Sequence, residues 1–315
     1  MDGSGGLRPH GFRTGQNDPV TLEKYPLGDD GAEAFVYIDL EGAESATGIV
    51  RAARKVLLDG ARALARHETY AWALCGARIS GASAGINAQP DQQAAAHETF
   101  TKVLADRTAL PRLSLRAGRG IPEQGDSAAD ILLAHGVVAA TGIALGGLEG
   151  QGVAIEADQP ATQQLSDLFQ ARGAQVELVE PTGFAASTAA ALICGSKVGQ
   201  IDHEVAAGLQ HRVLVPAGAT PVTAKGYAVL RRKECEVVPA FLSACGPLFL
   251  EAELAGQQAG TGSAEELGAR VEDHVVTRLG EFLSHPQGSF MAACLAAEEF
   301  LGSWVEELPF GRPLG

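Results

Sequence analysis

Short apolar runs alternate with amphipathic segments over the second half of the sequence, and this alternation limits the fold more than any other feature. Runs of four or so apolar residues are predicted to be strands, and the segments between them have apolar residues at helical spacing. The predicted strands are 153–155, 176–179, 191–194, 212–215 and 236–239, and the predicted helices are 162–172, 203–209 and 223–233. Strands joined by crossover helices form a parallel, doubly wound sheet.

The first half of the sequence also mixes predicted strands and helices. Residues 35–40 are β-branched and aromatic and are predicted to be a strand, whereas residues 47–67 have apolar residues at helical spacing. The glycine-rich run 81–85 is interpreted as a loop before an alanine- and glutamine-rich helix. A short strand at 113–115 and a glycine-rich loop at 117–120 follow. We therefore predict a second α/β domain in this half.

The length of the chain indicates two domains with a cleft between them, because domains typically have about 150 residues and this chain has 315. A long apolar helix at 128–146 is predicted to connect them and to contain the boundary. Residues 1–30 are rich in Gly, Asp and Pro without periodicity, as is typical of a flexible tail. The expected division is a tail at 1–30, an N-terminal α/β domain at 31–135, the doubly wound domain at 136–260 and C-terminal helices closing the cleft at 261–315.

Charge and cysteine content exclude several classes of partner. The formal net charge of −14 repels phosphate backbones and anionic lipid, so we expect neither nucleic acid nor a membrane surface as a partner. The five cysteines are odd in number and lack CxxC spacing, which argues against a disulfide framework or a zinc knuckle. The N-terminus has no apolar signal region, and no apolar stretch reaches the ~18 residues of a membrane span, so we predict a cytoplasmic protein.

Two stretches of the sequence resemble one enzyme family. Residues 64–71, LARHETYA, and 80–86, SGASAGI, are similar in order and spacing to LARGMTYK and GGGKxxI of the glutamate/leucine/phenylalanine/valine dehydrogenase family. Residues 141–155 resemble the family's ALGGLEGxxVAI run, and the likeness extends over roughly residues 34–304. The resemblance implies an N-terminal dimerisation-type α/β domain, a Rossmann-like domain, and NAD(P)-dependent deamination of amino acids.

The residues that this chemistry requires are replaced. Oxidative deamination requires a cation for the substrate carboxylate, a lysine of lowered pKa and a carboxylate that transfers protons. The resemblance places the family's two lysines on Ala71 and Ser83 and its acid on Gly118. Of a glycine pair that the family has, this chain keeps only Gly48, because Ile49 stands at the second position. No catalytic residue of the family is therefore expected to be intact.

The dinucleotide-binding loop is replaced as well. The family has a GxGxxG fingerprint after the first strand of its Rossmann-like domain, since glycines let the backbone approach the pyrophosphate. The corresponding residues here are Ala157, Asp158, Gln159, Pro160, Ala161 and Thr162. No glycine is present, and Asp158 would place a carboxylate against an anionic pyrophosphate. Glu180 matches the acid that holds the ribose hydroxyls, although a solvated glutamate at a strand end is the simpler interpretation. We expect no cofactor.

Arg51, Arg78 and Ser83 are the remaining candidates for a ligand site in the cleft. Guanidinium groups bind carboxylates through parallel hydrogen bonds, and Arg51 matches an arginine of the family; surface positions or salt bridges are the alternative for both arginines. Ser83 stands in a run with the letters GxSxG, but a nucleophile elbow belongs to a different fold. Two His-Glu pairs at 67–68 and 97–98 lack a third ligand, so we expect no metal site.

Three hypotheses for the function remain. The preferred one is a homologue of amino-acid dehydrogenases without dehydrogenase activity, acting as a partner subunit, a ligand sensor or an enzyme with different chemistry. The second is a divergent NAD(P)-dependent amino-acid oxidoreductase, and the third is a hetero-oligomeric stabiliser of an active paralogue. Because the family forms oligomers through its N-terminal domain, the resemblance implies a homo- or hetero-oligomer, with a small-molecule ligand in the cleft.

Overall fold

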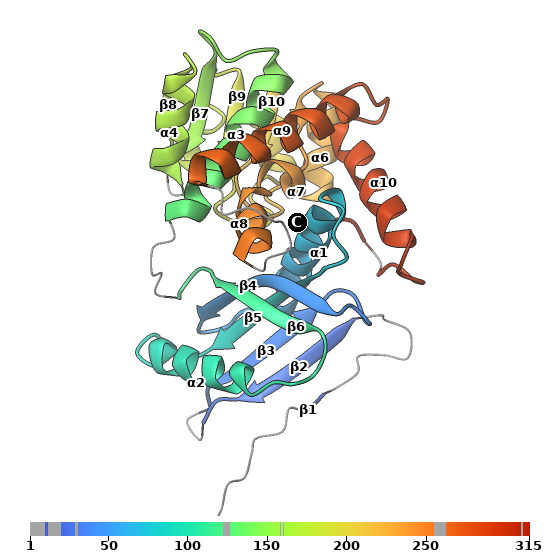
Figure 1. Ribbon diagram of the computed structural model, residues 1–315. Helices are drawn as coiled ribbons and strands as arrows, with labels where there is room; N and C mark the ends of the chain where they lie inside the picture. The colour runs from blue at the N-terminus through green and yellow to red at the C-terminus, as the bar shows by residue number, and fades with distance from the viewer. Residues whose placement is uncertain are drawn as a thin grey trace, which may run out of the picture. The chain divides into compact units, whose positions relative to one another are not determined.

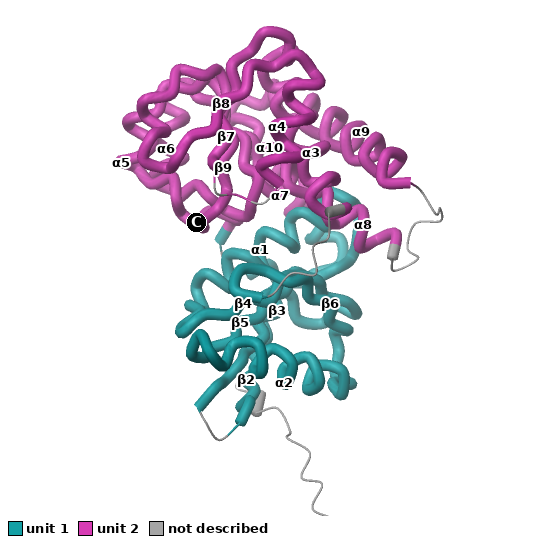
Figure 2. Tube along the Cα trace, turned by 90° about the vertical axis from the view of Figure 1, so that its left-hand side faces the viewer, with its two compact units in different colours: residues 1–124, 301–311 teal, residues 125–300, 312–315 magenta. Residues whose placement is uncertain are grey.

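The computed structural model describes residues 10–11, 20–28, 31–121, 127–157, 159, 161–254, 263–309 and 311–315 (Figure 1). The chain divides into two compact units (Figure 2). Unit 1 comprises residues 1–124 and 301–311, and unit 2 comprises residues 125–300 and 312–315. The chain therefore passes from unit 1 to unit 2, returns to unit 1 near the C-terminal end of the sequence and enters unit 2 again.

Unit 1 contains a mixed sheet, which in the described residues has the strand order β1-β2-β3-β5-β4-β6. The neighbours from β1 to β5 in this order pair antiparallel, and β4 pairs parallel with both β5 and β6. The strands are β1 His10–Gly11, β2 Thr21–Pro26, β3 Glu33–Ile38, β4 Ser45–Ala53, β5 Ser80–Asn87 and β6 Arg112–Ala117. Parallel neighbours require crossovers, which α1 (Leu58–Leu74) and α2 (Gln93–Ala105) supply.

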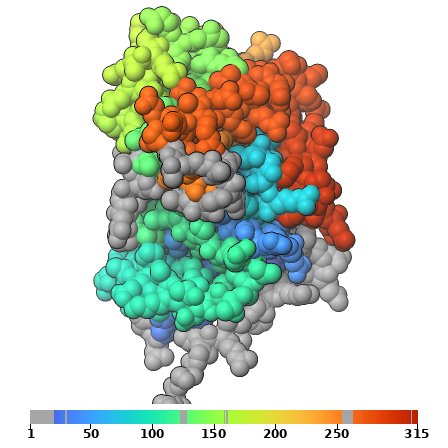
Figure 3. Space-filling view, in the orientation of Figure 1, coloured from blue at the N-terminus to red at the C-terminus, as the bar shows by residue number. Residues whose placement is uncertain are grey.

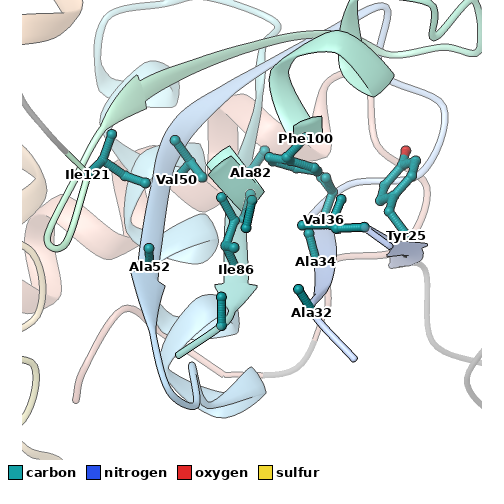
Figure 4. Packing of buried hydrophobic residues seen from close by; sticks show 14 of the residues in the cluster. Tyr25, Ala32, Ala34, Val36, Val50, Ala52, Ala82, Ile86, Phe100 and Ile121 are labelled. Carbon is teal, nitrogen blue, oxygen red and sulfur yellow. The ribbon is translucent and has the colours of Figure 1, made fainter. Parts of the chain in front are cut away.

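Both faces of this sheet are covered by a helix. Phe35 and Tyr37 of β3 lie in an apolar cluster with Ala61 and Ala65 of α1. The alternate residues of β3 lie in a second cluster on the opposite face, where Figure 4 shows Phe100 of α2 among the side chains of the strands. A sheet that is buried on both faces has nearly continuous apolar strands, which explains why β3 contains four consecutive apolar residues after Ala34.

Glycine at position 81 lets α1 approach β5 closely. A Cβ atom added at Gly81 would lie 1.8 Å from the carbonyl oxygen of Ala65 in α1. The Gly81 N–H also donates a hydrogen bond of 2.8 Å to the hydroxyl of Thr69. Gly48 on β4 has a similar role, since a Cβ there would lie 1.7 Å from the carbonyl oxygen of Ala82. The packing of unit 1 therefore requires Gly48, whether or not a substrate approaches this backbone.

Three sequence predictions for the first half are wrong. Residues 47–53 belong to β4 and the helix begins only at Leu58, because Thr, Ile and Val at these positions fit a strand between β5 and β6 equally well. Residues 81–85 lie inside β5 rather than in a loop. Residues 21–26 form β2 rather than a flexible tail, and the Arg107 guanidinium holds this strand through bonds of 2.6 and 2.9 Å to the Glu23 carboxylate. The predicted tail's residues 1–9, 12–19, 29 and 30 lie outside the described residues.

Unit 2 is a doubly wound parallel sheet with the strand order β11-β10-β9-β7-β8 in the described residues, which confirms the predicted fold class. The strands are β7 Gly152–Glu156, β8 Gln175–Val179, β9 Ala191–Cys194, β10 Val213–Pro216 and β11 Glu236–Val237. The helices are α3 Ser127–Leu145, α4 Thr162–Ala171, α5 His203–Gly208, α6 Ala224–Arg232, α7 Ala240–Ser243, α8 Gly246–Leu254, α9 Ala264–Leu283 and α10 Ser289–Gly302, with a short 3₁₀ turn at Pro181–Gly183.

The long apolar helix α3 belongs to unit 2 as a whole. The division between the units falls between residues 124 and 125, before α3 and not at residue 136 inside it. The reason is that α3 packs against α4, α8, α9 and β10 of unit 2. Its stretch Ala128–Leu145 is long and apolar enough to cross a membrane, contrary to the sequence analysis, and half of that stretch is buried inside the protein.

The C-terminal helices also pack in unit 2. Helix α9 buries Val271, Val275 and Leu279 and packs against α3, while its other side lies on the face of the protein seen in Figure 3. A capping box fixes its first turn, since the hydroxyl of Ser263 accepts from the Glu266 N–H and the Glu266 carboxylate accepts from the Ser263 N–H. Only residues 301–311 return to unit 1.

Candidate functional site

The carboxyl ends of β7 and β9 in unit 2 mark the point where the strand order reverses, which is where doubly wound sheets bind ligands. Glu156, the last residue of β7, is fully buried there. Its carboxylate accepts hydrogen bonds from the N–H groups of Gly195 and Ser196 at 2.8 and 3.1 Å. It also accepts from the Ser196 hydroxyl and, at 2.6 Å, from the Gln200 side-chain amide.

These four hydrogen bonds join β7 to the loop after β9 across the reversal point. The loops after β9 and β10 also touch, because a Cβ added at Gly218 would lie 2.3 Å from the Gly195 carbonyl oxygen. A buried carboxylate is stable when N–H and O–H donors surround it, as they do here. The Glu156 carboxylate therefore occupies the backbone N–H groups of Gly195 and Ser196 at the reversal point.

The predicted dinucleotide loop follows Glu156 directly. Ala157, Gln159, Ala161 and Thr162 are described, whereas Asp158 and Pro160 lie outside the described residues. Ala161 has a left-handed backbone with φ of 62°, a conformation in which glycine avoids the strain of a side chain. Gln159 and Ala161 are buried, and the Thr162 hydroxyl donates to the Gln159 carbonyl at 2.7 Å. Side chains thus occupy the positions that the resemblance assigns to the fingerprint.

Glu180 follows β8 and is exposed. Its backbone carbonyl accepts from the Gly183 N–H at 2.8 Å and so begins the 3₁₀ turn. The strand-end position matches the sequence analysis, because β8 is the direct neighbour of β7 in the sheet.

In unit 1, the positions that the resemblance assigns to the family's catalytic groups are buried or tightly packed. Ser83 lies in the middle of β5 between Tyr37 of β3 and Ile49 of β4 and is fully buried. Ala71 is buried in α1. Gly118 follows β6, where its N–H donates to the Val50 carbonyl at 2.8 Å and an added Cβ would lie 2.9 Å from that oxygen. Ser83 is therefore part of a central strand and has no elbow geometry.

Arg51 lies on the same face of the sheet as Ser83, because Ile49 pairs with Ser83 and strand residues alternate between faces. Its stem lies against Gly118, where an added Cβ would be 3.2 Å from Cγ, and its terminal nitrogens lie near Gly60 in the first turn of α1. Nε and Nη2 are buried without a hydrogen-bond partner among the described residues. Burial lowers the pKa of Arg51, and a buried donor without a partner is costly, so an anion here would stabilise the fold.

The other predicted ligand residue, Arg78, lies apart from these contacts. It is exposed in the segment between α1 and β5. The structure thus places Arg51 and Ser83 on the same face of the unit 1 sheet. Arg78 is exposed and does not belong to a buried site. Among the residues that the structure describes, no group of three His, Cys, Asp or Glu side chains could hold a metal ion.

A polar network beneath α1 was missed by the sequence analysis. The Glu68 carboxylate accepts from the Thr47 hydroxyl at 3.0 Å and from the Arg116 guanidinium at 3.0 Å. The Trp72 indole N–H donates to the same Thr47 oxygen at 2.6 Å. Glu68 and Trp72 are four residues apart and share a helix face, which is the one signal in the sequence that could have pointed to this network.

His67 in the same helix should make unit 1 less stable in mild acid. Burial lowers the pKa of the His67 imidazole from 6.5 to about 4, so the folded state stays neutral where the unfolded chain binds a proton. Stability is therefore complete above pH 6.5 and falls as the pH decreases toward 4. We expect a loss of about 2 kcal/mol between pH 7 and pH 5 in urea unfolding followed by tryptophan fluorescence.

His67→Gln should flatten this pH dependence, since a side chain that does not titrate leaves proton binding equal in both states. His274, whose pKa burial also lowers to about 4, lies in unit 2 and should keep its effect there. An unchanged slope in His67→Gln would show that another group controls the acid response of unit 1.

The fold of this chain, a mixed α/β unit followed by a doubly wound parallel unit, is similar to that of solved amino-acid dehydrogenases. L-tryptophan dehydrogenase from Nostoc punctiforme superposes with a TM-score of 0.65 at 16% identity over 90% of this chain and 95% of that chain. Hetero-hexameric glutamate dehydrogenase from Thermus thermophilus, in a leucine-bound form, gives a TM-score of 0.66 at 18% identity over 89% and 88%. Glutamate dehydrogenase from Peptoniphilus asaccharolyticus gives 0.66 at 13% identity over 91% and 92%.

These similarities extend over nearly the whole chain and establish the fold, as the resemblance in the sequence implied. No family model and no curated protein matches the sequence itself.

Proposed function

We propose that this protein binds a small carboxylate ligand within the amino-acid dehydrogenase fold and does not oxidise amino acids. The observation that carries the proposal is the Glu156 carboxylate, which is bonded to the Gly195–Ser196 backbone at the reversal point of the sheet. A dinucleotide pyrophosphate at this reversal point would meet that buried negative charge and could not use the N–H groups that the carboxylate already occupies. The loop that follows has no glycine to let a pyrophosphate approach the backbone.

The substitutions in unit 1 support the same proposal. Ala71 and Ser83 replace the lysines that the resemblance implies, and both are almost completely buried. A lysine at either position would place an ammonium group in an apolar interior, at a cost of several kcal/mol. Variants that carry lysine at either position are therefore expected to unfold.

Arg51 supports the ligand part of the proposal. Its unpartnered buried nitrogens fit the planar, two-bond geometry with which guanidinium binds carboxylates. The leucine-bound, hetero-hexameric glutamate dehydrogenase has the same fold, which supports a role as a ligand-sensing subunit in a mixed assembly. A hetero-oligomeric stabiliser without any ligand is the second candidate, and the same hetero-hexamer favours it.

A calorimetric titration of the full chain with NADH and NADPH tests the first part of the proposal. We expect no saturable binding up to about 1 mM of either nucleotide at physiological salt, which corresponds to less than about 4 kcal/mol of binding free energy. Amino-acid oxidation with either nucleotide should stay at background. A micromolar dissociation constant for NADH would contradict the proposal and favour the divergent oxidoreductase.

The same titration with L-leucine and L-glutamate as probes tests the ligand. Arg51→Met should weaken any binding observed by about tenfold or more, because one charge-assisted contact is lost. Arg78→Met is the matched control, since it removes an exposed arginine of the same unit, and should leave the affinity unchanged. Equal affinity in the Arg51→Met and Arg78→Met variants would exclude Arg51 from the site. If neither L-leucine nor L-glutamate bound, the hetero-oligomeric stabiliser would be favoured.

A further inference from the structure

A hollow of about 300 Å³ lies at one end of the sheet in unit 1, and none of the candidate-site residues described above lines it. It opens at the carboxyl ends of the parallel strands β4 and β5 and beside the start of β3. A cavity of this volume is at the lower limit of those that bind small molecules. Its lining includes Arg54 and Lys55 after β4, Asn87 at the end of β5, Gln89 and Gln92 before α2, and Glu33 of β3.

The lining carries two cations that have no ion-pair partner among the described residues. Arg54 and Lys55 are both exposed, and none of the ion pairs in the described part of the chain includes either of them. Among the described lining residues Glu33 is the one carboxylate, and it accepts from the Asn87 side-chain amide at 3.1 Å. The described lining therefore carries two cations without an ion pair and one carboxylate, which is already hydrogen-bonded.

These two cations contrast with the chain as a whole, whose formal net charge is −14. An anion approaching the protein is repelled by most of its surface, so a local pair of cations determines where it can bind. Arginine binds phosphate oxygens through parallel N–H groups, and lysine adds a point charge. The side-chain amides of Gln89 and Gln92 can donate to further oxygens.

We propose that this hollow binds a phosphate group, held by Arg54 and Lys55 with Gln89 and Gln92 as additional donors. A phosphate dianion matches the two positive charges, and the volume leaves room for a small organic group on a phosphomonoester. The two sources of this chemistry are free phosphate and a small phosphate ester. The lining contains neither Arg51 nor a residue of unit 2, so this proposal does not depend on the proposed function.

Calorimetric titrations with inorganic phosphate and with glycerol 3-phosphate, at constant ionic strength, test this proposal. The full chain should bind both probes at one saturable site. The double variant R54A/K55A should weaken binding by at least tenfold, because both charge-assisted contacts are lost. A clear preference for glycerol 3-phosphate would assign the hollow to an ester, and equal affinities would assign it to the free ion.

The matched control is K225A/R232A, which removes one lysine and one arginine that are exposed in unit 2. This variant has the same net charge as R54A/K55A and should bind both probes as the unchanged protein does. Equal weakening in the two double variants would overturn the proposal, because general charge would then explain the binding. The absence of saturable phosphate binding would also overturn it. Urea midpoints of the variants confirm that each is folded.

Discussion

Replacing Arg66 by Met is expected to lower the free energy of unfolding of unit 1 by about 3–5 kcal/mol, as breaking a buried ion pair typically does. The Arg66 guanidinium lies 2.7 Å from the Asp39 carboxylate, and Asp39 is fully buried. Arg66 also donates to the carbonyl oxygens of Pro309, at 2.8 Å, and Gly311. Its loss leaves a buried charge without its partner and two carbonyls of the returning segment 301–311 without their donor.

The measurement is urea unfolding followed by tryptophan fluorescence. The protein's two tryptophans, Trp72 and Trp304, both belong to unit 1, so the signal reports this unit. Lys102→Met is the control, because its ion pair with Glu98 is exposed and should leave the transition unchanged. The double variant Asp39→Leu with Arg66→Met removes both charges and should recover part of the loss. An effect of Arg66→Met no larger than that of Lys102→Met would contradict the role of the ion pair.

Replacing Glu156 by Met should destabilise unit 2 by about 3–5 kcal/mol, because buried donors that lose a charged acceptor each cost about 1–3 kcal/mol. Methionine has a similar length but cannot accept from the Gly195 and Ser196 N–H groups or from the Gln200 amide. The loop after β9 would separate from β7. Hydrogen exchange of the Gly195 and Ser196 amides, measured by mass spectrometry, should therefore accelerate more than that of β10.

Two further variants separate the acceptor role of Glu156 from its volume. Glu156→Gln keeps one carbonyl oxygen that can accept from both N–H groups, so we expect a smaller loss than for methionine. Glu180→Gln changes an exposed glutamate at the end of the neighbouring strand and should have no effect on stability. Equal losses in Glu156→Met and Glu156→Gln would indicate that the negative charge, and not the hydrogen bonds, stabilises the loop.

The parallel sheet of unit 2 could be predicted from the sequence because its strands are buried on both faces. Residues of β9 and β10 are all buried, and such strands appear in a sequence as short continuous apolar runs. The helices between them carry their own start signals, such as Asp202, whose side chain accepts from two N–H groups of α5. Both signals are local, so the fold class of this unit is readable without the structure.

In unit 1, small residues make strand β5 difficult to recognise from the sequence. The run Gly81–Gly85 has neither strand nor helix preference of its own, yet it forms the centre of β5. It does so because α1 approaches closest at Gly81 and because Tyr37 and Ile49 lie on either side of Ser83. Tertiary packing overrides propensity at such positions. The sequence could not distinguish this strand from a glycine-rich loop.

The sequence by itself thus determined the α/β class and the doubly wound second unit. Only the tertiary structure decided the partners of the buried charges. Glu156 accepts from residues about 40 positions later, and Arg66 donates to Pro309, 243 positions later. Periodicity and capping report contacts within a few residues, whereas crossover connections bring these groups together. A buried charge therefore appears in the sequence only as one polar residue in an apolar run, without any indication of its partner.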